Sequence, residues 1–294
     1  CYNIADTLIV GQFLGRNALA AVGSAFTLMT FLTSVILGLC MGSGALFSVC
    51  WGQRDLARLR RQTHAAFMLI AACTVVLNAA AFLLLDAMKT LLSVPAEVWP
   101  LMRSYLFVIF FGIGGTFLYN YYASLLRAVG NSLVPLLFLA AAAVLNIALD
   151  LVFVLVCRWG VEGAAAATVL AQWLSGIGTA VYTLVRCPEL RARREERRIT
   201  GAMLRELLGA SVLTCLQQSV MNLGILMVQG RINSFGPVIM AAFAAAVKID
   251  SFAYMPLQDF GNAFSTFIAQ NYGAQQPERI RRGIRTAVLL SSVF

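Results

Sequence analysis

Charged residues are scarce in this chain of 294 residues: Asp, Glu, Lys and Arg together make up 12%, and there is one histidine. A soluble globular domain has about 25% charged residues. The sequence contains no G-x-S-x-G, H-E-x-x-H or G-x-x-x-x-G-K-[ST] motif. It therefore lacks the signatures of a serine hydrolase, a zinc metalloprotease and a nucleotide-driven motor. We expect a protein that is not an enzyme.

Several other features that would point to a soluble or secreted protein are missing. The seven cysteines form no C-x-x-C pair and lie mostly in apolar runs, which favours packing over a metal site or a disulfide framework. The net charge of +9 comes from arginines placed between apolar runs rather than on one basic face, so we expect no nucleic-acid partner. The chain starts without Met and stops inside an apolar run, and we expect a fragment of a longer protein.

The sequence is instead rich in long apolar runs. Hydrophobic residues make up 60% of the chain, and the mean hydropathy is +0.80. Most of the apolar runs exceed the roughly 20 residues that a helix needs to cross a bilayer. The sequence predicts an all-α polytopic membrane protein in contact with lipid. Its expected spans cover about 1–14 (the end of a first span), 17–50, 63–86, 98–126, 133–156, 163–185, 203–229 and 237–270, followed by the start of a ninth.

The charges of the loops predict the orientation of these spans. Sixteen arginines fall in one set of alternate loops, and five Arg or Lys residues fall in the other set. Since Lys and Arg are retained on the cytoplasmic side, the first span should run from the cytoplasm outward in the inner (plasma) membrane. The polar segment 187–202 should then be a cytoplasmic, solvated linker.

An internal repeat relates the two parts of the chain. One alignment without gaps, with a shift of 221 residues, matches Gly15 with Gly236 and Gly52 with Gly273. The shift carries the second expected span onto the eighth, six spans later, so both copies cross the membrane in the same direction. The repeat predicts two parallel six-helix halves related by an axis along the membrane normal.

Ionisable groups inside these spans are the candidate functional residues. Asn146 and Asp150 are four residues apart, so on a helix they share one face. A carboxylate at mid-membrane depth costs a few kcal/mol and usually faces a bundle interior or an ion path. The alternative is that such acids only hydrogen-bond neighbouring helices. Lys248, Asp250 and Asp259 are further ionisable residues within the 237–270 span, where a purely structural ion pair is an equal alternative.

Five segments resemble the multidrug and toxic compound extrusion (MATE) transporters. They are YNxxDTLIVGxxLGxxALAAVG (2–23), LLRAVGNSxxP (125–135), NIALD (146–150), GVEGAAxATxxAQ (160–172) and AQNYGAQQPERIRRG (269–283). The last segment resembles the bacterial branch typified by the DNA-damage-inducible F protein. The resemblance implies a MATE-like bundle of twelve helices in two lobes. Residues 1–186 would form the N-lobe, 187–202 the linker, and 203–294 the start of the C-lobe.

The resemblance also implies a function. It points to a secondary active transporter, monomeric in the membrane, that exports cationic or amphipathic organic compounds in exchange for H⁺ or Na⁺. No other cofactor is expected. The cation site of the family falls here on Tyr2, Asp6, Asn146, Asp150 and Thr168, and Na⁺ would be held by the last four of these. Two carboxylates enclosed in one lobe repel each other when both are ionised, so the site would take up a proton or a monovalent cation.

A second polar position lies on the expected seventh helix. Some relatives carry a buried Glu there, whereas this chain has Gln217 and Gln218 in that region, so a C-lobe ion site on that pattern is not expected. These two residues, together with the three ionisable residues of 237–270, are candidates for polar or substrate contacts.

Three alternatives to drug efflux remain open from the sequence. A lipid-linked oligosaccharide or polysaccharide flippase of the same superfamily should have an Arg-rich groove, whereas Arg is almost confined to loops here. A membrane-embedded enzyme would need a catalytic cluster of His, Asp or Ser. A passive channel is disfavoured by the two-lobed repeat.

Overall fold

The computed structural model describes residues 9–292, and every regular element within that range is helical. The order is α2 (Arg16–Gly52), α3 (Leu56–Leu83), α4 (Ala87–Leu91), α5 (Trp99–Ile109), α6 (Ile113–Ala128), α7 (Leu133–Asp150), α8 (Gly160–Arg186), α9 (Gly201–Asn233), α10 (Pro237–Gly273) and α11 (Pro277–Ser291). Short non-α turns lie at Phe110–Gly112 (η1), Leu151–Val156 (η2), Pro188–Leu190 (η3) and Arg194–Arg197 (η4). The all-α expectation is confirmed.

Six helical stretches in the described part of the chain are long and apolar enough to cross a membrane. They are Arg16–Gly52, Leu56–Leu83, Trp99–Ala128, Leu133–Val156, Gly160–Arg186 and Gly201–Asn233. The long helix α10 matches α2 in length, and its first part, Pro237–Val247, is apolar. The chain is therefore a multi-pass membrane protein, as the hydropathy predicted.

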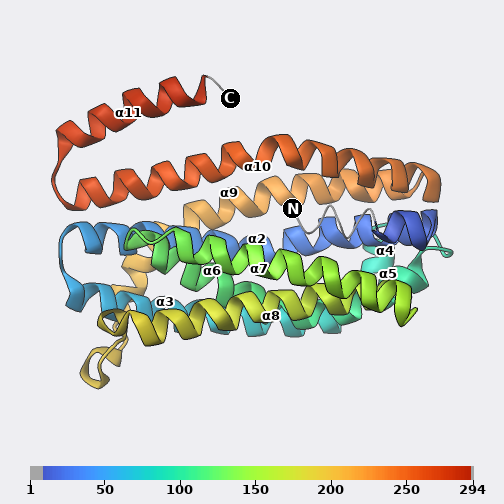
Figure 1. The fold of residues 1–294 in the computed structure, drawn as a ribbon, viewed down its shortest axis with the longest axis horizontal. Coiled ribbons are helices and arrows are strands. Elements are labelled where there is room, and N and C mark those ends of the chain that lie inside the picture. The colour runs from blue at the N-terminus through green and yellow to red at the C-terminus, as the bar shows by residue number, and fades with distance from the viewer. Residues whose placement is uncertain (1–8, 293–294) are drawn as a thin grey trace.

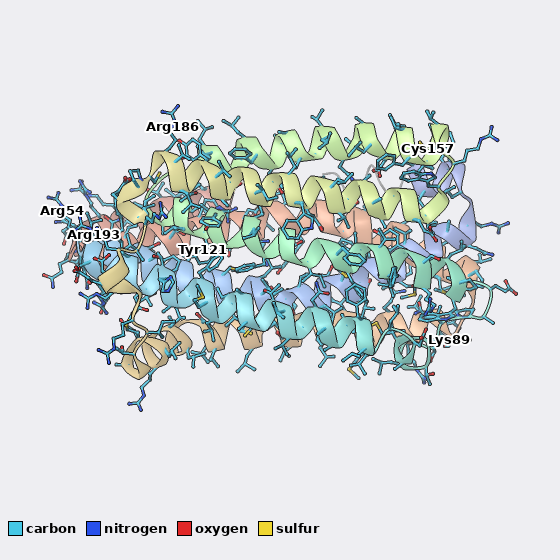
Figure 2. The ribbon with its side chains drawn as sticks, turned by 90° about the horizontal axis from the view of Figure 1, so that it is seen from below. Arg54, Lys89, Tyr121, Cys157, Arg186 and Arg193 are labelled. Atoms are coloured by element: carbon cyan, nitrogen blue, oxygen red, sulfur yellow. The ribbon has the colours of Figure 1, made fainter. Side chains whose placement is uncertain are left out.

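The long helices lie side by side along the long axis of the molecule, and α2 is central (Figure 1). It lies between α9 and α10 on one side and α3 with α6 on the other, and it packs against all of them. One end of the bundle carries Arg54, Arg186 and Arg193, and we call it the linker end (Figure 2). The opposite end carries Lys89 and Cys157, and we call it the Lys89 end.

The internal repeat keeps its register in three dimensions. Helices α2 and α10 both have 37 residues, and their first and last residues are each related by the shift of 221. Their N-caps, Gly15 and Gly236, have φ values of 87° and 93°, a conformation that glycine adopts without strain. Arg54 and Gln275, also 221 apart, both have positive φ, at 59° and 52°. The two copies thus share helix length and turn geometry.

Two of the expected spans are interrupted. The 98–126 span is α5 and α6 separated by the 3₁₀ turn at Phe110–Gly112, and the 133–156 span is α7 followed by π-helix from Leu151 to Val156. The first break lies where the chain approaches α8: a Cβ on Gly115 would lie 2.8 Å from the backbone of Gln172. Hydropathy gave no indication of either break, since the residues at the breaks, FFG and LVFVLV, are apolar.

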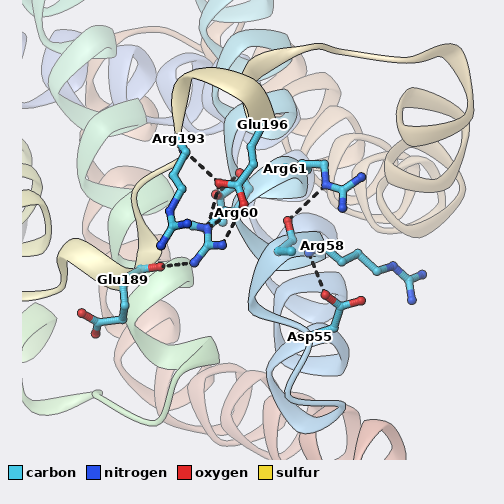
Figure 3. Close-up of polar contacts among 9 residues, drawn as sticks. Asp55, Arg58, Arg60, Arg61, Glu189, Arg193 and Glu196 are labelled. Atoms are coloured by element: carbon cyan, nitrogen blue, oxygen red, sulfur yellow. Dashed lines mark hydrogen bonds and ion pairs between the residues drawn. The ribbon is translucent and has the colours of Figure 1, made fainter.

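The polar linker is folded against α3 rather than freely solvated. Arg60 of α3 donates to both carboxylate oxygens of Glu196, from Nε at 2.8 Å and from Nη2 at 2.7 Å. Glu196 also accepts from the backbone N–H of Arg193 at 2.9 Å (Figure 3). These hydrogen bonds, with Arg60 the largest contributor, lower the pKa of Glu196 to about 2. Leu190 is buried at the same place. The linker therefore has a fixed path along α3.

Candidate functional site: a buried polar cluster beside a central cavity

Asn146 and Asp150 lie one turn apart at the end of α7, and both side chains are fully buried. Asn146 Nδ2 donates a hydrogen bond of 3.2 Å to Oγ1 of Thr168 on α8, which is itself 3% exposed. Within the described residues, Asn146 Oδ1 has no hydrogen-bond partner. The structure thus brings together two of the predicted site residues, Asn146 and Thr168, and places Asp150 one turn further along the same helix.

Asp150 is the last residue of the α-helical part of this span. The π-helix Leu151–Val156 follows immediately, with the N–H of Cys157 donating to the carbonyl of Val152 at 2.9 Å. A π-helical turn is rare, and it is found frequently at functional sites because it changes the direction of the side chains around it. The backbone of this span therefore changes its winding at the buried carboxylate.

The other two predicted members of the cation site, Tyr2 and Asp6, lie outside the described residues. Their roles, and those of Asn146, Asp150 and Thr168, stay predictions.

A cavity of about 420 Å³ lies in the middle of the bundle, between α2 and α10 and against α5, α6, α7, α8 and α9. Thr168 lines it, so one residue contacts both the cavity and Asn146. The lining is aromatic and amide-rich, and none of its described residues is charged. These aromatic and amide groups are Phe26, Tyr105, Tyr119, Asn120, Gln172, Gln218, Asn222, Tyr254 and Gln258. Such a lining suits an organic molecule with a large apolar surface and a few polar groups.

Toward the Lys89 end, the cavity is followed by a buried polar network that joins α2 to α9. Gln229 Nε2 donates to Ser24 Oγ and to Asn233 Oδ1, at 3.0 and 2.8 Å. Thr27 Oγ1 donates to Gln229 Oε1 at 3.2 Å, and Asn233 Nδ2 donates to the backbone carbonyl of Leu92 at 2.9 Å. The side chains of Ser24, Thr27, Gln229 and Asn233 are all buried. We call these four residues the α2–α9 network.

Toward the linker end, α2 and α10 approach each other through glycine. A Cβ on Gly52 would lie 2.1 Å from the carbonyl oxygen of Gln270, and a Cβ on Gly273 would lie 2.2 Å from that of Val49. Val49 and Gln270 are also 221 residues apart, so the two contacts are copies of each other. At the other end of the same helix pair, a Cβ on Gly23 would lie 2.2 Å from that of its repeat partner Ala244. The cavity is thus flanked by a symmetric contact at either end.

The candidate residues on α9 and α10 differ in their burial. Gln218 is buried and lines the cavity, whereas Gln217 is exposed. Asp250 and Asp259 are also exposed. The side chain of Lys248 lies outside the described part of the chain.

Sequence reasoning missed the α2–α9 network and Gln172. Gln229 and Asn233 are four residues apart within an apolar span, the same spacing that marks Asn146 and Asp150, so this signal could have found them. Gln172 has a buried Oε1 with no hydrogen-bond partner in the described range, and it lies against Gly112 in the 3₁₀ turn. In the sequence it is the last residue of the GVEGAAxATxxAQ segment (160–172), which is the signal that could have found it.

Comparison with known proteins decides the family. A family model described as MatE matches residues 1–152 and 210–294, most of the chain. The chain belongs to the MatE family. The resemblance stated from the sequence motifs is therefore confirmed.

Relatives and solved structures agree with this assignment. The chain is 29% identical over 280 residues to the probable multidrug resistance protein YpnP of Bacillus subtilis, covering 95% of this chain and 62% of the relative. It is 24% identical to the FAD transporter of Shewanella oneidensis, covering 100% of this chain and 66% of the relative. Among solved structures, the MATE multidrug transporter DinF-BH superposes with a TM-score of 0.91 at 26% identity, covering 99% of this chain and 66% of the other. The chain thus spans less than two thirds of the length of these proteins.

Proposed function

We propose that the full protein is a secondary active efflux transporter that exports amphipathic organic compounds, cationic ones in particular, in exchange for H⁺ or Na⁺. The observation that carries this proposal is the position of Thr168, which lines the central cavity and accepts the hydrogen bond of Asn146 one turn from the buried Asp150. A substrate in the cavity and a cation at the carboxylate would then share a side chain through which each can affect the other.

The buried polar cluster suits the coupling ion. Carboxylate, amide and hydroxyl oxygens are hard ligands that accept a proton or a monovalent cation in water-poor surroundings. Asn146 Oδ1 is buried and lacks a partner within the described range, which leaves one oxygen available to such an ion. In this proposal Asp150 and Asp6 bind the ion, while Asn146, Thr168 and Tyr2 support them.

The cavity suits the substrate. Its tyrosines and amides offer apolar surface and hydrogen bonds without fixed charge among the described lining residues. The same absence of arginine disfavours the flippase alternative, because a pyrophosphate-linked substrate would need basic groups to hold it. The relative named as an FAD transporter makes an anionic aromatic substrate the competitor to test.

The positions of the arginines give the proposed orientation of the protein in the membrane. In this proposal the linker end faces the cytoplasm, since Arg54, Arg186 and Arg193 lie there. Binding of a cation in the N-lobe would change which arrangement of the helices is favoured. Because binding energies are reciprocal, substrate binding would change the affinity for the cation by the same factor.

The decisive experiment uses the full-length protein in vesicles and follows efflux of a fluorescent cationic dye under a proton gradient and a sodium gradient imposed separately. We expect the parent to respond to one gradient and Asp150→Asn to lose that response. The matched control is Asp86→Asn, because Asp86 is an exposed acid at the Lys89 end that pairs with Arg103. Gradient-driven efflux that survives in Asp150→Asn would overturn the cation site. Export of FAD with no export of the dye would overturn the substrate class alone.

A further inference from the structure

A second cavity lies at the linker end, apart from the central one. It has a volume of about 280 Å³ and lies between α3, α6 and α8, with the start of the linker as its rim. Figure 2 shows Tyr121 in the space between α3 and α8, close to the Arg-rich end. We call this cavity the linker pocket. None of the described residues proposed for transport lines it.

The floor of the linker pocket is aromatic and rigid. Tyr121 and Tyr122 stack edge to face with ring centroids 5.0 Å apart, and Phe67 packs on Tyr121 at 5.2 Å. The hydroxyl of Tyr121 donates to the backbone carbonyl of Thr63 at 2.7 Å, which fixes the ring. The pocket therefore exists in the folded protein without a ligand to shape it.

The open side of the linker pocket carries exposed apolar side chains, which suit contact with lipid. Met68 of α3 and Leu184 of α8 line it and are 46% and 45% exposed. Leu184 lies in the last turn of α8, and the pocket begins seven residues into α3, about 10 Å along the helix. The pocket therefore lies close to the linker ends of α3 and α8, where a membrane-spanning helix leaves the apolar part of a bilayer.

The rim of the linker pocket is basic. Arg191 lines it, is exposed, and makes no side-chain hydrogen bond or ion pair with any described residue. Its backbone is held in place because the linker is fixed on both sides: Arg60 donates to the carbonyl of Glu189 at 3.4 Å and to the carboxylate of Glu196 (Figure 3). His64 also lines this part of the pocket. Glu189, the acid nearest to Arg191 in the sequence, is not part of the lining.

From this arrangement we infer that the linker pocket binds an anionic phospholipid. The phosphodiester lies at Arg191, and a segment of one acyl chain lies over the aromatic floor between α3 and α8. Basic pockets between transmembrane helices bind acidic lipid headgroups in this way. The volume of the linker pocket is that of roughly nine water molecules, at about 30 Å³ each in liquid water. It can therefore hold part of a lipid but not a whole one. The inference does not depend on the direction or the driving ion of transport.

The test measures lipid retention by the purified full-length protein. Native mass spectrometry with phosphatidylglycerol, phosphatidylcholine and glycerol phosphate as separate probes reports the number bound and the apparent dissociation constant. We expect tight retention of one phosphatidylglycerol and at least tenfold weaker binding in Arg191→Gln, because a hydrogen bond to a charged group is lost. Arg191→Lys should keep most of the affinity, which separates loss of charge from loss of folding.

Arg186, the last residue of α8, provides a matched control. Arg186→Gln removes the same charge from an exposed arginine that does not line the pocket and lies on the far side of α8 from Tyr121 (Figure 2). A second variant, Leu184→Trp, fills the open side and should also reduce retention. Equal loss in Arg191→Gln and Arg186→Gln would overturn the site, as would equal binding of phosphatidylcholine. Displacement of the lipid by glycerol phosphate alone would overturn the lipid assignment and show a free phosphate site instead.

Discussion

Closure of the linker end depends on two glycines, and Gly273→Ala tests this directly. A Cβ at residue 273 would lie 2.2 Å from the carbonyl oxygen of Val49, whereas ordinary contact begins at 3.4 Å. The atom it meets belongs to the backbone of α2, so no change of rotamer relieves the overlap. Helices α2 and α10 must then separate by about 1 Å where they now touch.

The energetic effect can be worked out from the size of the overlap. Forcing an extra methyl group into a closely packed contact costs about 1–3 kcal/mol. If the helices can open at this end, as alternating access requires, the substitution destabilises only the closed arrangement. The ratio of open to closed molecules should then rise by about 5- to 150-fold. Gly52→Ala should have a similar effect, because its contact with Gln270 is the repeat-related copy.

The assay measures distances between spin labels on exposed positions of α3 and α11, at Arg61→Cys and Arg285→Cys, in the full-length protein. Gly273→Ala should move the distance distribution toward longer values. Gly261→Ala is the control, since it lies on the same helix and a Cβ there would have no atom within 4 Å. A distribution in Gly273→Ala that coincides with those of the parent and of Gly261→Ala would refute the reasoning.

Three further predictions concern the polar contacts. Thr168→Val removes the hydroxyl that accepts the hydrogen bond of Asn146. The free energy of unfolding, measured by thermal denaturation, should therefore fall by about 1–3 kcal/mol. Gln229→Leu breaks the α2–α9 network. The thiol introduced by Thr27→Cys should therefore react faster with a membrane-impermeant reagent in the double variant than in the Thr27→Cys single variant. The pKa of Glu196 is lowered to about 2, so its stabilising ion pair is present above the ordinary carboxyl value and lost only as the pH falls toward 2. Hydrogen exchange of the linker, corrected for intrinsic rates, should therefore stay constant from about pH 5 to 8 and rise in Glu196→Gln.

The sequence predicts the helical architecture well because each element has its own local signal. The shift of 221 residues aligned Gly52 with Gly273, and the two helices that end at these residues have the same bounds in the structure once shifted. Glycine recurs at 15 and 236 because both helices begin after a residue with positive φ. It recurs at 52 and 273 because a Cβ at either position would overlap a backbone carbonyl of the other helix. The bounds of these helices could therefore be read from the repeat.

Residue spacing could predict the candidate site only where its residues are neighbours on one helix, and Thr168 of α8 came from the family resemblance instead. Four-residue spacing placed Asn146 and Asp150 on one buried face, and both are fully buried. By contrast, the pairing of Ser24 with Asn233 joins residues 209 apart, and hydrophobicity carries no information about which buried polar groups meet. The π-helix after Asp150 was equally unpredictable, because Leu151–Val156 is uniformly apolar and favours an ordinary α-helix.

The two ends of the central cavity are closed by different chemistry, although the helices that flank it are repeat copies. At the linker end the contact is between backbones, with Gly52 and Gly273 each facing a carbonyl. At the Lys89 end the α2–α9 network adds hydrogen bonds among four buried side chains, and opening there must expose or rehydrate all of them. Water can satisfy those groups as the helices part, whereas the glycine contact loses only packing. If the ends open alternately, substitutions in the α2–α9 network should therefore act through the hydration of the Lys89 end, and substitutions at the glycines through distance alone.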